Sequence, residues 1–387
     1  MAVREELSEL IADLVRIETE NPPGNERACA EFIVDWFESH DIEATLVDEP
    51  YEDRPQAVAT VGEGDPTLVL NGHIDVVPAG DREQWTHDPY AGEIEDGHLY
   101  GRGSVDMKGG VAVGMLATRA LRDRIERGDL SGSVVFQGAI GEETAEPGTR
   151  SLLEEGYDGD YAVVLEPTGL RTATSEKGLA WYEITIEGEP SHASRPDQGV
   201  NAIQNARPVL DALAEYDERI RERRDDLVGS AYATTTEFRA GTKENVVPER
   251  ATITLDRRFI PEESVEAVDE EIDELLASVE VEHGIETDWR RTRTYESAAI
   301  PEDSPLAAVF RTHSEQVADV DPSPWGVRAS TDVRNFVNDH GIEAITWGPG
   351  EIGQAHTFDE NLELEEAFVG YEVLVDAAAE LSDSETR

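Results

Sequence analysis

Imidazole and carboxylate side chains, the usual ligands of catalytic metal ions, recur in six short segments of the chain. The segments are GHIDVVP, GRGSVDMKGG, GEETAEPGT, LEPT, PSHASRP and GQAHTFDE, and they carry His73, Asp75, Asp106, Glu142, Glu143, Glu166, His192 and His356. Mixed histidine and carboxylate sets suit catalytic zinc and its neighbours in the transition series, whereas structural zinc sites usually contain cysteines. The chain has only Cys29, so the pattern predicts a catalytic metal site.

His73 and Asp75 come at the exit of a predicted strand. The run from Thr67 to Leu70 is apolar, and a glycine and a proline interrupt the pattern after it. Residues two apart on a strand point to the same side, so we expect Asp75 to accept the second ring N–H of His73 and to fix its tautomer. Asp106 lies among glycines just before a helical stretch, and its carboxylate could bridge two metals.

The other candidate ligands also follow predicted strands. Glu142 and Glu143 come after the strand-like SGSVVFQGAI, and adjacent side chains diverge, so one can bind metal while the other moves protons. Glu166 ends the strand-like YAVVLEPT, and His356 follows the exit AITWGPG. Open α/β sheets bind their ligands at the carboxyl ends of the strands. We therefore expect these side chains to converge.

Each segment alone has a simpler interpretation. A His-x-Asp pair usually marks a surface loop, adjacent glutamates in so acidic a chain usually form a solvated pair, and GRGSVDMKGG could be a flexible loop. The glycine segment is not a phosphate-binding loop, because no Gly-Lys-Ser/Thr follows it. The order of all six segments, each at the end of an element, favours one metal centre over these separate interpretations.

Together the segments resemble the dinuclear zinc deacylase and peptidase family of acetylornithine deacetylase, succinyl-diaminopimelate desuccinylase, aminoacylase and glutamate carboxypeptidase, over nearly the whole chain. The resemblance implies that Glu142 is the general base and that Asp75 orients His73. It also implies two divalent metal ions, with zinc as the first expectation and cobalt or manganese as alternatives. Their ligands would be His73 and Glu166 for one ion, Glu143 and His356 for the other, and Asp106 as the bridge.

Three substrate-facing residues are also implied by the resemblance. PSHASRPDQGVNA is similar to the family segment whose histidine reaches a neighbouring subunit's active site and stabilises the oxyanion, which is His192 here. Asn245 in KENVVP and Arg258 in LDRRF resemble positions that contact the carboxylate end of the substrate, with the adjacent Arg257 as the alternative. Family members use the domain that carries these residues as a lid and dimer surface, so a homodimer is expected.

The expected reaction is hydrolysis of an amide by metal-activated water, with Glu142 taking the proton of the water and returning it to the departing amine. Glu166 favours a deacylase of N-acyl amino acids, because peptidases of the resembled family tend to carry aspartate there. A carboxypeptidase or dipeptidase is the alternative. RASTDVRNF departs from the Gly-Thr-Ser-Asp-Gly of the desuccinylase, which disfavours a succinyl group. A protein that only binds metal or substrate would not need the spare carboxylate of Glu142.

The spacing of the apolar runs predicts an α/β fold. These runs alternate with helical stretches and lie near residues 67–71, 133–140 and 160–165. Such alternation indicates a mostly parallel sheet with helices on both faces. We expect residues 1–175 and 292–387 to form this catalytic domain. Residues 176–291 are predicted to be inserted into it as a ferredoxin-like β-α-β-β-α-β lid and dimerisation domain, with its last strand at 281–289.

The composition is strongly acidic. The 387 residues include 85 acidic and 32 basic side chains, for a net charge of −53, and the lysines are Lys108, Lys177 and Lys243. Concentrated salt shortens the screening length to about 3 Å at 1 M and makes such a charge tolerable. We therefore expect the protein to lie in the cytoplasm of a high-salt organism. The sign of the charge disfavours nucleic acid and anionic membranes as partners. No apolar run approaches the length of a membrane span.

Overall fold

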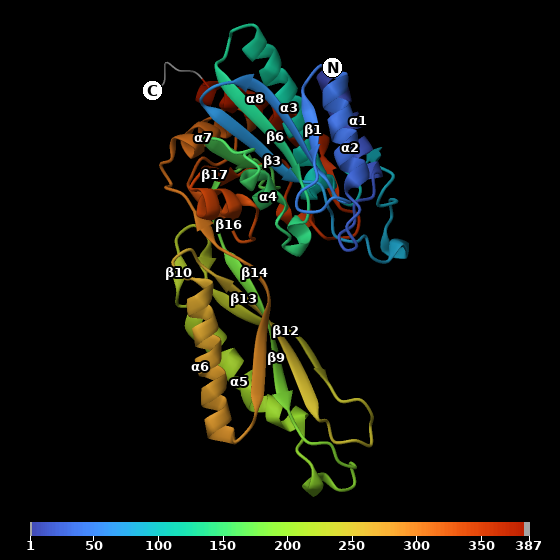
Figure 1. The fold of residues 1–387 in the computed structure, drawn as a ribbon, viewed down its shortest axis with the longest axis vertical. Coiled ribbons are helices and arrows are strands. Elements are labelled where there is room, and N and C mark those ends of the chain that lie inside the picture. The colour runs from blue at the N-terminus through green and yellow to red at the C-terminus, as the bar shows by residue number, and fades with distance from the viewer. Residues whose placement is uncertain (1, 383–387) are drawn as a thin grey trace. The chain divides into compact units, whose positions relative to one another are not determined.

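The computed structural model describes residues 2–382 and divides into two compact units (Figure 1). Unit 1 contains Met1–Thr174, Ala299–Val327 and Thr331–Arg387. Unit 2 contains Ser175–Ala298 and Arg328–Ser330. Most of the smaller unit therefore comes from a single stretch that interrupts the chain of the larger one.

Unit 1 is built on a nine-stranded mixed sheet in the order β1-β2-β6-β3-β7-β17-β8-β15, with β16 paired to β8. Its four central strands are parallel, namely β6 (Gly132–Ala139), β3 (Thr67–His73), β7 (Tyr161–Val164) and β17 (Glu343–Thr346). Antiparallel pairs flank them, formed by β1 (Ala44–Val47) and β2 (Gln56–Glu63) on one side and β8 (Ala173–Glu176) on the other. The sheet ends with β15 (Ala298–Ala299) and β16 (Trp325–Val327). The predicted α/β class is confirmed.

Helices cover both faces of this sheet. All residues of β6 and nearly all of β3 are buried, and because side chains alternate between faces, burial without alternation means that each face is covered. Helix α2 packs against β1 and β2, and α3 packs against β2, β3 and β6. The helices of unit 1 are α1 (Ala2–Arg16), α2 (Arg27–Ser39), α3 (Gly109–Glu126), α4 (Gly148–Glu154), α7 (Pro305–Ala318) and α8 (Leu364–Ser382).

The glycines at the start of α3 allow that helix to lie against the exit of β7. A Cβ atom on Gly110 would come within 2.1 Å of the backbone oxygen of Leu165, so a larger residue cannot stand there without moving the helix. Asp106 precedes α3, and Glu166 follows Leu165. The glycine-rich segment thus brings two predicted ligands together by close packing.

Short elements connect these layers. A three-stranded sheet has the order β18-β5-β4, formed by Asn361–Glu363, His98–Tyr100 and Glu93–Glu95. Single helical turns are η1 (Arg82–Gln84), η2 (Ser104–Lys108), η3 (Glu142–Thr144), η5 (Asn335–Asp339) and η6 (Ile352–Gln354).

Unit 2 has a four-stranded antiparallel sheet in the order β12-β13-β9-β14 and two long helices. The chain order is β9 (Gly178–Glu187), α5 (Ala202–Ile220), β12 (Tyr232–Ala240), β13 (Arg250–Phe259), α6 (Val265–His283) and β14 (Thr287–Tyr295), with η4 (Pro196–Gln198) and the pair β10 (Arg224–Asp225) and β11 (Gly229–Ser230) between them. This is the predicted β-α-β-β-α-β arrangement. Burial alternates along β9 and β13, so one face of the sheet forms the core with the helices.

The last strand of unit 2 was predicted too early, at 281–289. Helix α6 continues to His283, and Gly284 ends it with a φ of 64°. A glycine in this left-handed conformation is the common stop of a helix, and the strand begins only after it, at Thr287. Unit 2 therefore extends to Ala298, beyond the predicted boundary at residue 291.

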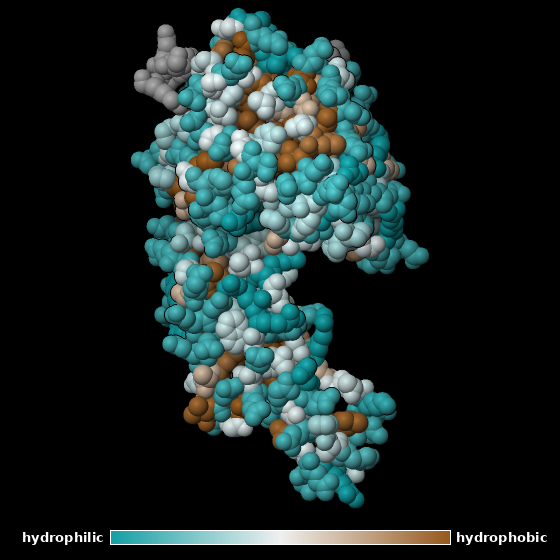
Figure 2. Space-filling model, viewed as in Figure 1, coloured by the Kyte–Doolittle hydropathy of each residue, from teal (hydrophilic) through white to brown (hydrophobic). Residues whose placement is uncertain are grey.

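Hydrophilic residues dominate the face drawn in Figure 2. Two of the lysines are not part of the surface, because Lys108 and Lys177 are buried and Lys243 is exposed. The Nζ atom of Lys108 donates to the backbone oxygens of Leu14 and Ile17, at the carboxyl end of α1. Among the described residues, no helix is both long and apolar enough to cross a membrane.

Candidate metal centre

Three potential ligands meet at the carboxyl edge of the central sheet in unit 1. His73 is the last residue of β3, Asp106 lies in η2 ahead of α3, and Glu143 lies in η3 after β6. Each offers one ligand atom, and these atoms all lie within 4.8 Å of one another. Because β3 and β6 are parallel, they end at the same edge, which explains how side chains far apart in the sequence meet.

Asp106 is shared between two imidazoles. Its Oδ1 atom lies 3.0 Å from Nε2 of His73, and its Oδ2 atom lies 3.2 Å from Nε2 of His356. His73 Nε2 is also 3.5 Å from Oε1 of Glu166, and His356 Nε2 is 3.2 Å from Oε2 of Glu143. Each imidazole therefore has a carboxylate of its own and shares Asp106 with the other. The structure brings all five predicted metal ligands into one cluster.

This cluster contains more carboxylate than its buried environment tolerates without counter-charges. Burial raises the pKa of Glu166 well above its ordinary value, and the charge of Asp106 adds to the rise. Burial also raises the pKa of Glu143, again with help from Asp106. Burial alone would lower the pKa of His73, but its contacts with Asp106 and Asp75 raise that pKa well above the usual value. Without a cation the cluster therefore holds protons.

The donor set fits two divalent cations. One group comprises His73, Asp106 through Oδ1 and Glu166, and the other comprises His356, Asp106 through Oδ2 and Glu143. Imidazole nitrogen and carboxylate oxygen together suit zinc, cobalt and manganese. Cations would take the place of the protons that the buried groups otherwise retain.

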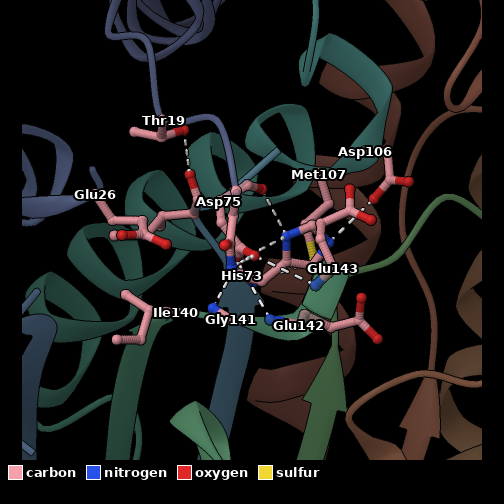
Figure 3. A network of polar contacts seen from close by, with 12 residues as sticks. Thr19, Glu26, His73, Asp75, Asp106, Met107, Ile140, Gly141, Glu142 and Glu143 are labelled. Atoms are coloured by element: carbon pink, nitrogen blue, oxygen red, sulfur yellow. Dashed lines mark hydrogen bonds and ion pairs between the residues drawn. The ribbon is translucent and has the colours of Figure 1, made fainter. Parts of the chain in front are cut away.

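Asp75 holds the turn that carries Glu142 and Glu143 (Figure 3). Its carboxylate oxygens accept the backbone N–H groups of Gly141 at 2.9 Å and of Glu142 and Glu143 at 3.3 Å each. His73 Nδ1 lies 2.9 Å from the backbone oxygen of Asp75 and 3.6 Å from its Oδ1 atom. The backbone carbonyl thus makes the hydrogen bond that we expected from the carboxylate, and the carboxylate orders the turn after β6.

Glu142 stands beside the ligands with a different set of neighbours. Its side chain and that of Glu143 extend in different directions in Figure 3. Nη1 of Arg334 lies 3.7 Å from Oε1 of Glu142, and Nη2 of Arg334 lies 3.2 Å from Oδ1 of Asp332. Burial raises the pKa of Glu142 to about 8, with His73 opposing the rise and Asp332 adding to it. Sequence reasoning missed Arg334, although it follows Asp332 in RASTDVRNF.

The three substrate-facing candidates lie at two separate places on unit 2. His192 forms a β-bridge with Val246, and the N–H of Ala193 donates to the backbone oxygen of Asn245 at 3.0 Å, so His192 and Asn245 are neighbours. Arg258 lies near the far end of β13, where it binds Asp256 through Nε and Nη2. At about 3.4 Å per residue, the strand separates the two places by roughly 25 Å.

The structure also distinguishes Arg258 from its neighbour. Arg257 is fully buried and donates through Nε to the hydroxyl of Tyr216 at 2.8 Å. Its Nη2 atom lies 2.5 Å from Oε1 of Glu263. The side chain of Arg258 is partly exposed, so it is the more accessible of the two arginines.

The fold and the cluster define a class of hydrolase with a metal centre at the edge of an α/β sheet, and sequence comparison identifies the family. The chain belongs to peptidase family M20/M25/M40, whose model matches residues 69–380. A probable succinyl-diaminopimelate desuccinylase of Staphylococcus epidermidis is 28% identical over 378 residues, with 91% of each chain covered. The succinyl-diaminopimelate desuccinylase of Methylobacterium radiotolerans is 34% identical over 281 residues, which cover 68% of this chain and 69% of the relative.

Solved structures share this fold at low identity. An M20 family metallo-carboxypeptidase of Sulfolobus solfataricus has a TM-score of 0.81 at 16% identity and covers 97% of this chain and 99% of its own. A dinuclear metal binding peptidase of Bacillus subtilis from the same family has a TM-score of 0.72 at 19% identity, with 98% and 99% covered. These likenesses show that the chain has the M20 fold, and the family match makes it a hydrolase.

Proposed function

We propose that the protein is a metal-dependent amidohydrolase that removes an N-acyl group from an amino acid. The observation that carries this proposal is Asp106, whose two oxygens face two imidazoles that each have a carboxylate partner of their own. A carboxylate shared in this way is what two adjacent cations require. A metallo-carboxypeptidase or dipeptidase of the same family is the alternative, and the fold of the Sulfolobus solfataricus structure is compatible with it.

Each residue then has a defined task. Two bound cations would supply an activated water and polarise the amide carbonyl. Glu142 takes the proton from the water and returns it to the nitrogen of the departing amine. Asp75 holds the backbone of Gly141, Glu142 and Glu143, so the base stays at a fixed place beside the ligands. Burial of Glu142 favours proton transfer near neutral pH, since it raises the pKa of that carboxyl.

Replacement of the base tests this mechanism. We expect Glu142→Gln to lower kcat by about 10²–10⁴, because the glutamine cannot accept a proton, while both metal ions are retained. Glu155→Gln, an exposed glutamate beyond α4, is the matched control and should leave kcat unchanged. Metal content by plasma mass spectrometry and initial rates are the measurements. Unchanged hydrolysis by the Glu142→Gln protein would remove Glu142 from the mechanism.

A substrate panel separates the deacylase from the peptidase. Two relatives are named for desuccinylation, and Glu166 favours a deacylase, which together support N-acyl amino acids as substrates. Release rates would be compared for N-acetyl-ornithine, N-succinyl-diaminopimelate, other N-acyl amino acids and dipeptides, with metal added and with metal chelated. Dipeptide cleavage without deacylation would favour the alternative. Hydrolysis that survives chelation would contradict both.

We also infer a homodimer in which His192 acts in the partner's site. The separation between His192 and Arg258 on one unit supports this proposal, because the two side chains cannot serve one small substrate from the same copy. Mixing inactive His192→Ala and Glu142→Gln proteins should restore activity, since half of the mixed population would be heterodimers with one complete site, or about a quarter of the normal sites. If His192 acted in its own subunit, no mixture would regain activity.

A high-salt environment is a further part of the proposal. The net charge of −53 and the burial of two of the three lysines support it, because ammonium groups are then nearly absent from the surface. We expect the free energy of unfolding to increase between about 0.1 M and 2 M KCl as carboxylate repulsion is screened. Denaturant titrations at both salt concentrations would measure this increase, and a stability independent of salt would contradict it.

A further inference from the structure

We propose that Glu360 is a positioning residue that holds two ligands of the metal centre, Asp106 and His356. The inference rests on the proposed metal centre and adds a residue that would not itself touch a cation. Glu360 lies in the same loop as His356, four residues further along the chain, and its side chain reaches the backbone of Asp106. One carboxylate thus connects Asp106, which both cations would share, with His356, which is a ligand of one cation.

The contacts of Glu360 are all made inside unit 1. Its side chain is fully buried, and Oε1 accepts the backbone N–H of Val105 at 3.0 Å and of Asp106 at 3.2 Å. Oε2 accepts Nη1 of Arg102 at 2.5 Å. Hydrogen bonds to a buried carboxylate are about twice as strong as neutral ones, so this one side chain restrains the segment just before Asp106 firmly.

The loop that carries His356 must also be held in place. His356 has a φ of 62°, which is uncommon for a residue with a side chain, and more than half of its side chain is exposed. Glu360 fixes the loop after it, because its backbone oxygen accepts the N–H of Gly101 at 2.9 Å and the following residues form β18 against β5. The same residue therefore ends the loop of His356 and orders the segment of Asp106.

Asp75 provides a parallel at another ligand of the cluster. There, too, a buried carboxylate accepts backbone N–H groups of a turn that carries a ligand, namely Glu143. Hydrogen-bonding groups behind metal ligands typically contribute a factor of about 10–100 in metal affinity. Loss of Glu360 should weaken mainly the affinity for the cation of His356 and Glu143. Two ligands of that cation, the bridging carboxylate and the imidazole, are positioned by Glu360.

Glu360 could instead serve only as half of a buried ion pair that stabilises the fold. Glu26 is the matched control for that role, since it is equally buried and its carboxylate accepts Nε and Nη2 of Arg54 at 2.8 and 2.6 Å. Both of these hydrogen bonds come from an arginine, whereas Glu360 accepts one from an arginine and also accepts the backbone N–H of the ligand Asp106. A purely structural role predicts the same outcome for both glutamates.

In the experiment, the metal-stripped full chain is titrated with Co²⁺. Calorimetry and visible absorption measure the binding of each ion. The variants are Glu360→Ala, Glu360→Gln and Glu26→Ala. We expect Glu360→Ala to bind the second Co²⁺ about 10–100-fold more weakly and with a changed absorption band. Glu360→Gln, which keeps one acceptor for the two N–H groups, should recover part of the loss. Glu26→Ala should lose thermal stability and bind both ions as the unaltered protein does.

Two safeguards keep the outcomes distinct. Glu360→Ala leaves Arg102 buried without its partner, so the double variant Arg102→Met with Glu360→Met removes both charges and should still bind the second Co²⁺ weakly. The inference is overturned if the Glu360 variants bind the second ion as tightly as the unaltered protein, or if Glu26→Ala weakens it equally. If the unaltered protein binds fewer than two Co²⁺ ions, the metal centre of the proposed function fails instead.

Discussion

The two halves of the cluster differ in how the fold holds them. His73 ends a central strand, and its side chain is only 1% exposed, whereas the side chain of His356 is 53% exposed and stands on a loop. Glu166 comes two residues after the end of β7, but Glu143 lies in a turn that is held by Asp75. The buried half therefore takes its geometry from the sheet. The open half depends on hydrogen bonds from residues outside the donor set.

This difference implies that the two halves bind their cations with unequal affinity. Ligands on strand ends are already in place before an ion arrives, so little order is lost on binding. A ligand on an exposed loop must be restrained at the time of binding unless other side chains already hold it. We expect the buried half to bind its ion more tightly, and the open half to respond to changes in its anchors.

The largest effect should come from Asp106, which both halves share. Replacing it by asparagine removes the charge that faces both imidazoles and should release both cations. Hydrolysis should then fall by at least about a thousandfold, equivalent to several kcal/mol of transition-state stabilisation. Metal content and kcat are the measurements. Retention of a full complement of two ions by Asp106→Asn would break the idea that one carboxylate serves both halves.

A direct comparison of the two histidines should give the next largest effect. His73→Ala opens a cavity among buried polar groups and should lower the free energy of unfolding by about 2–4 kcal/mol. His356→Ala changes a half-exposed loop and should lower it by less than His73→Ala does. Each variant should lose one cation in dialysis, so the contrast lies in denaturant titrations. Equal destabilisation by the two variants would contradict the distinction between the buried half and the open half.

The pH dependence of the metal-stripped protein offers a third test. The pKa values of Glu166 and His73 are raised in the folded chain, that of Glu142 to about 8, and hydrogen bonds with Asp106 and Glu143 raise that of His356 to about 10. The folded state then binds more protons than the unfolded state, so the stability falls as pH rises. This loss should extend from about pH 5 through 10.

Glu142 and His356 contribute to that loss over different ranges of pH. The contribution of Glu142 disappears by about pH 8, whereas that of His356 is fully present below about 6.5 and is lost only as pH approaches 10. His356→Ala should therefore flatten mainly the upper part of the curve, measured by denaturant titrations at several pH values. Saturating Co²⁺ should reduce the dependence, because cations replace the protons. A stability that rises with pH in the stripped protein would contradict the sign.

Sequence reasoning succeeded where local pattern and sheet geometry point to the same place. His73 and Glu166 follow short apolar runs that indicate buried strands, and parallel strands end at one edge, so their meeting was predictable. The same logic reached the order of elements in unit 2. It failed at the start of β14, because Gly284 ends α6 among apolar residues that resemble a strand.

The residues that hold the ligands were harder to predict. Glu360 is one acidic residue among 85, and its role depends on reaching the backbone of Asp106 across a large separation in sequence. Arg334 shows the same limit, since its position beside Glu142 depends on how distant segments pack. For Asp75, alternation along the strand gave the correct neighbour but not the atom, because β3 ends at His73 and the backbone turns beyond it.

The smallest effect should come from Asn21, which lies behind the open half. Its Nδ2 atom donates to Oδ2 of Asp75 at 3.1 Å and to the hydroxyl of Thr144 at 2.7 Å, so it joins the carboxylate to the end of the turn that carries Glu142. Asn21→Ala should lower the free energy of unfolding by about 1 kcal/mol. It should also lower kcat several-fold while both cations stay bound, because the base loses a restraint but no ligand is removed. Loss of the cation of the buried half in this variant would show that the two halves are not held independently.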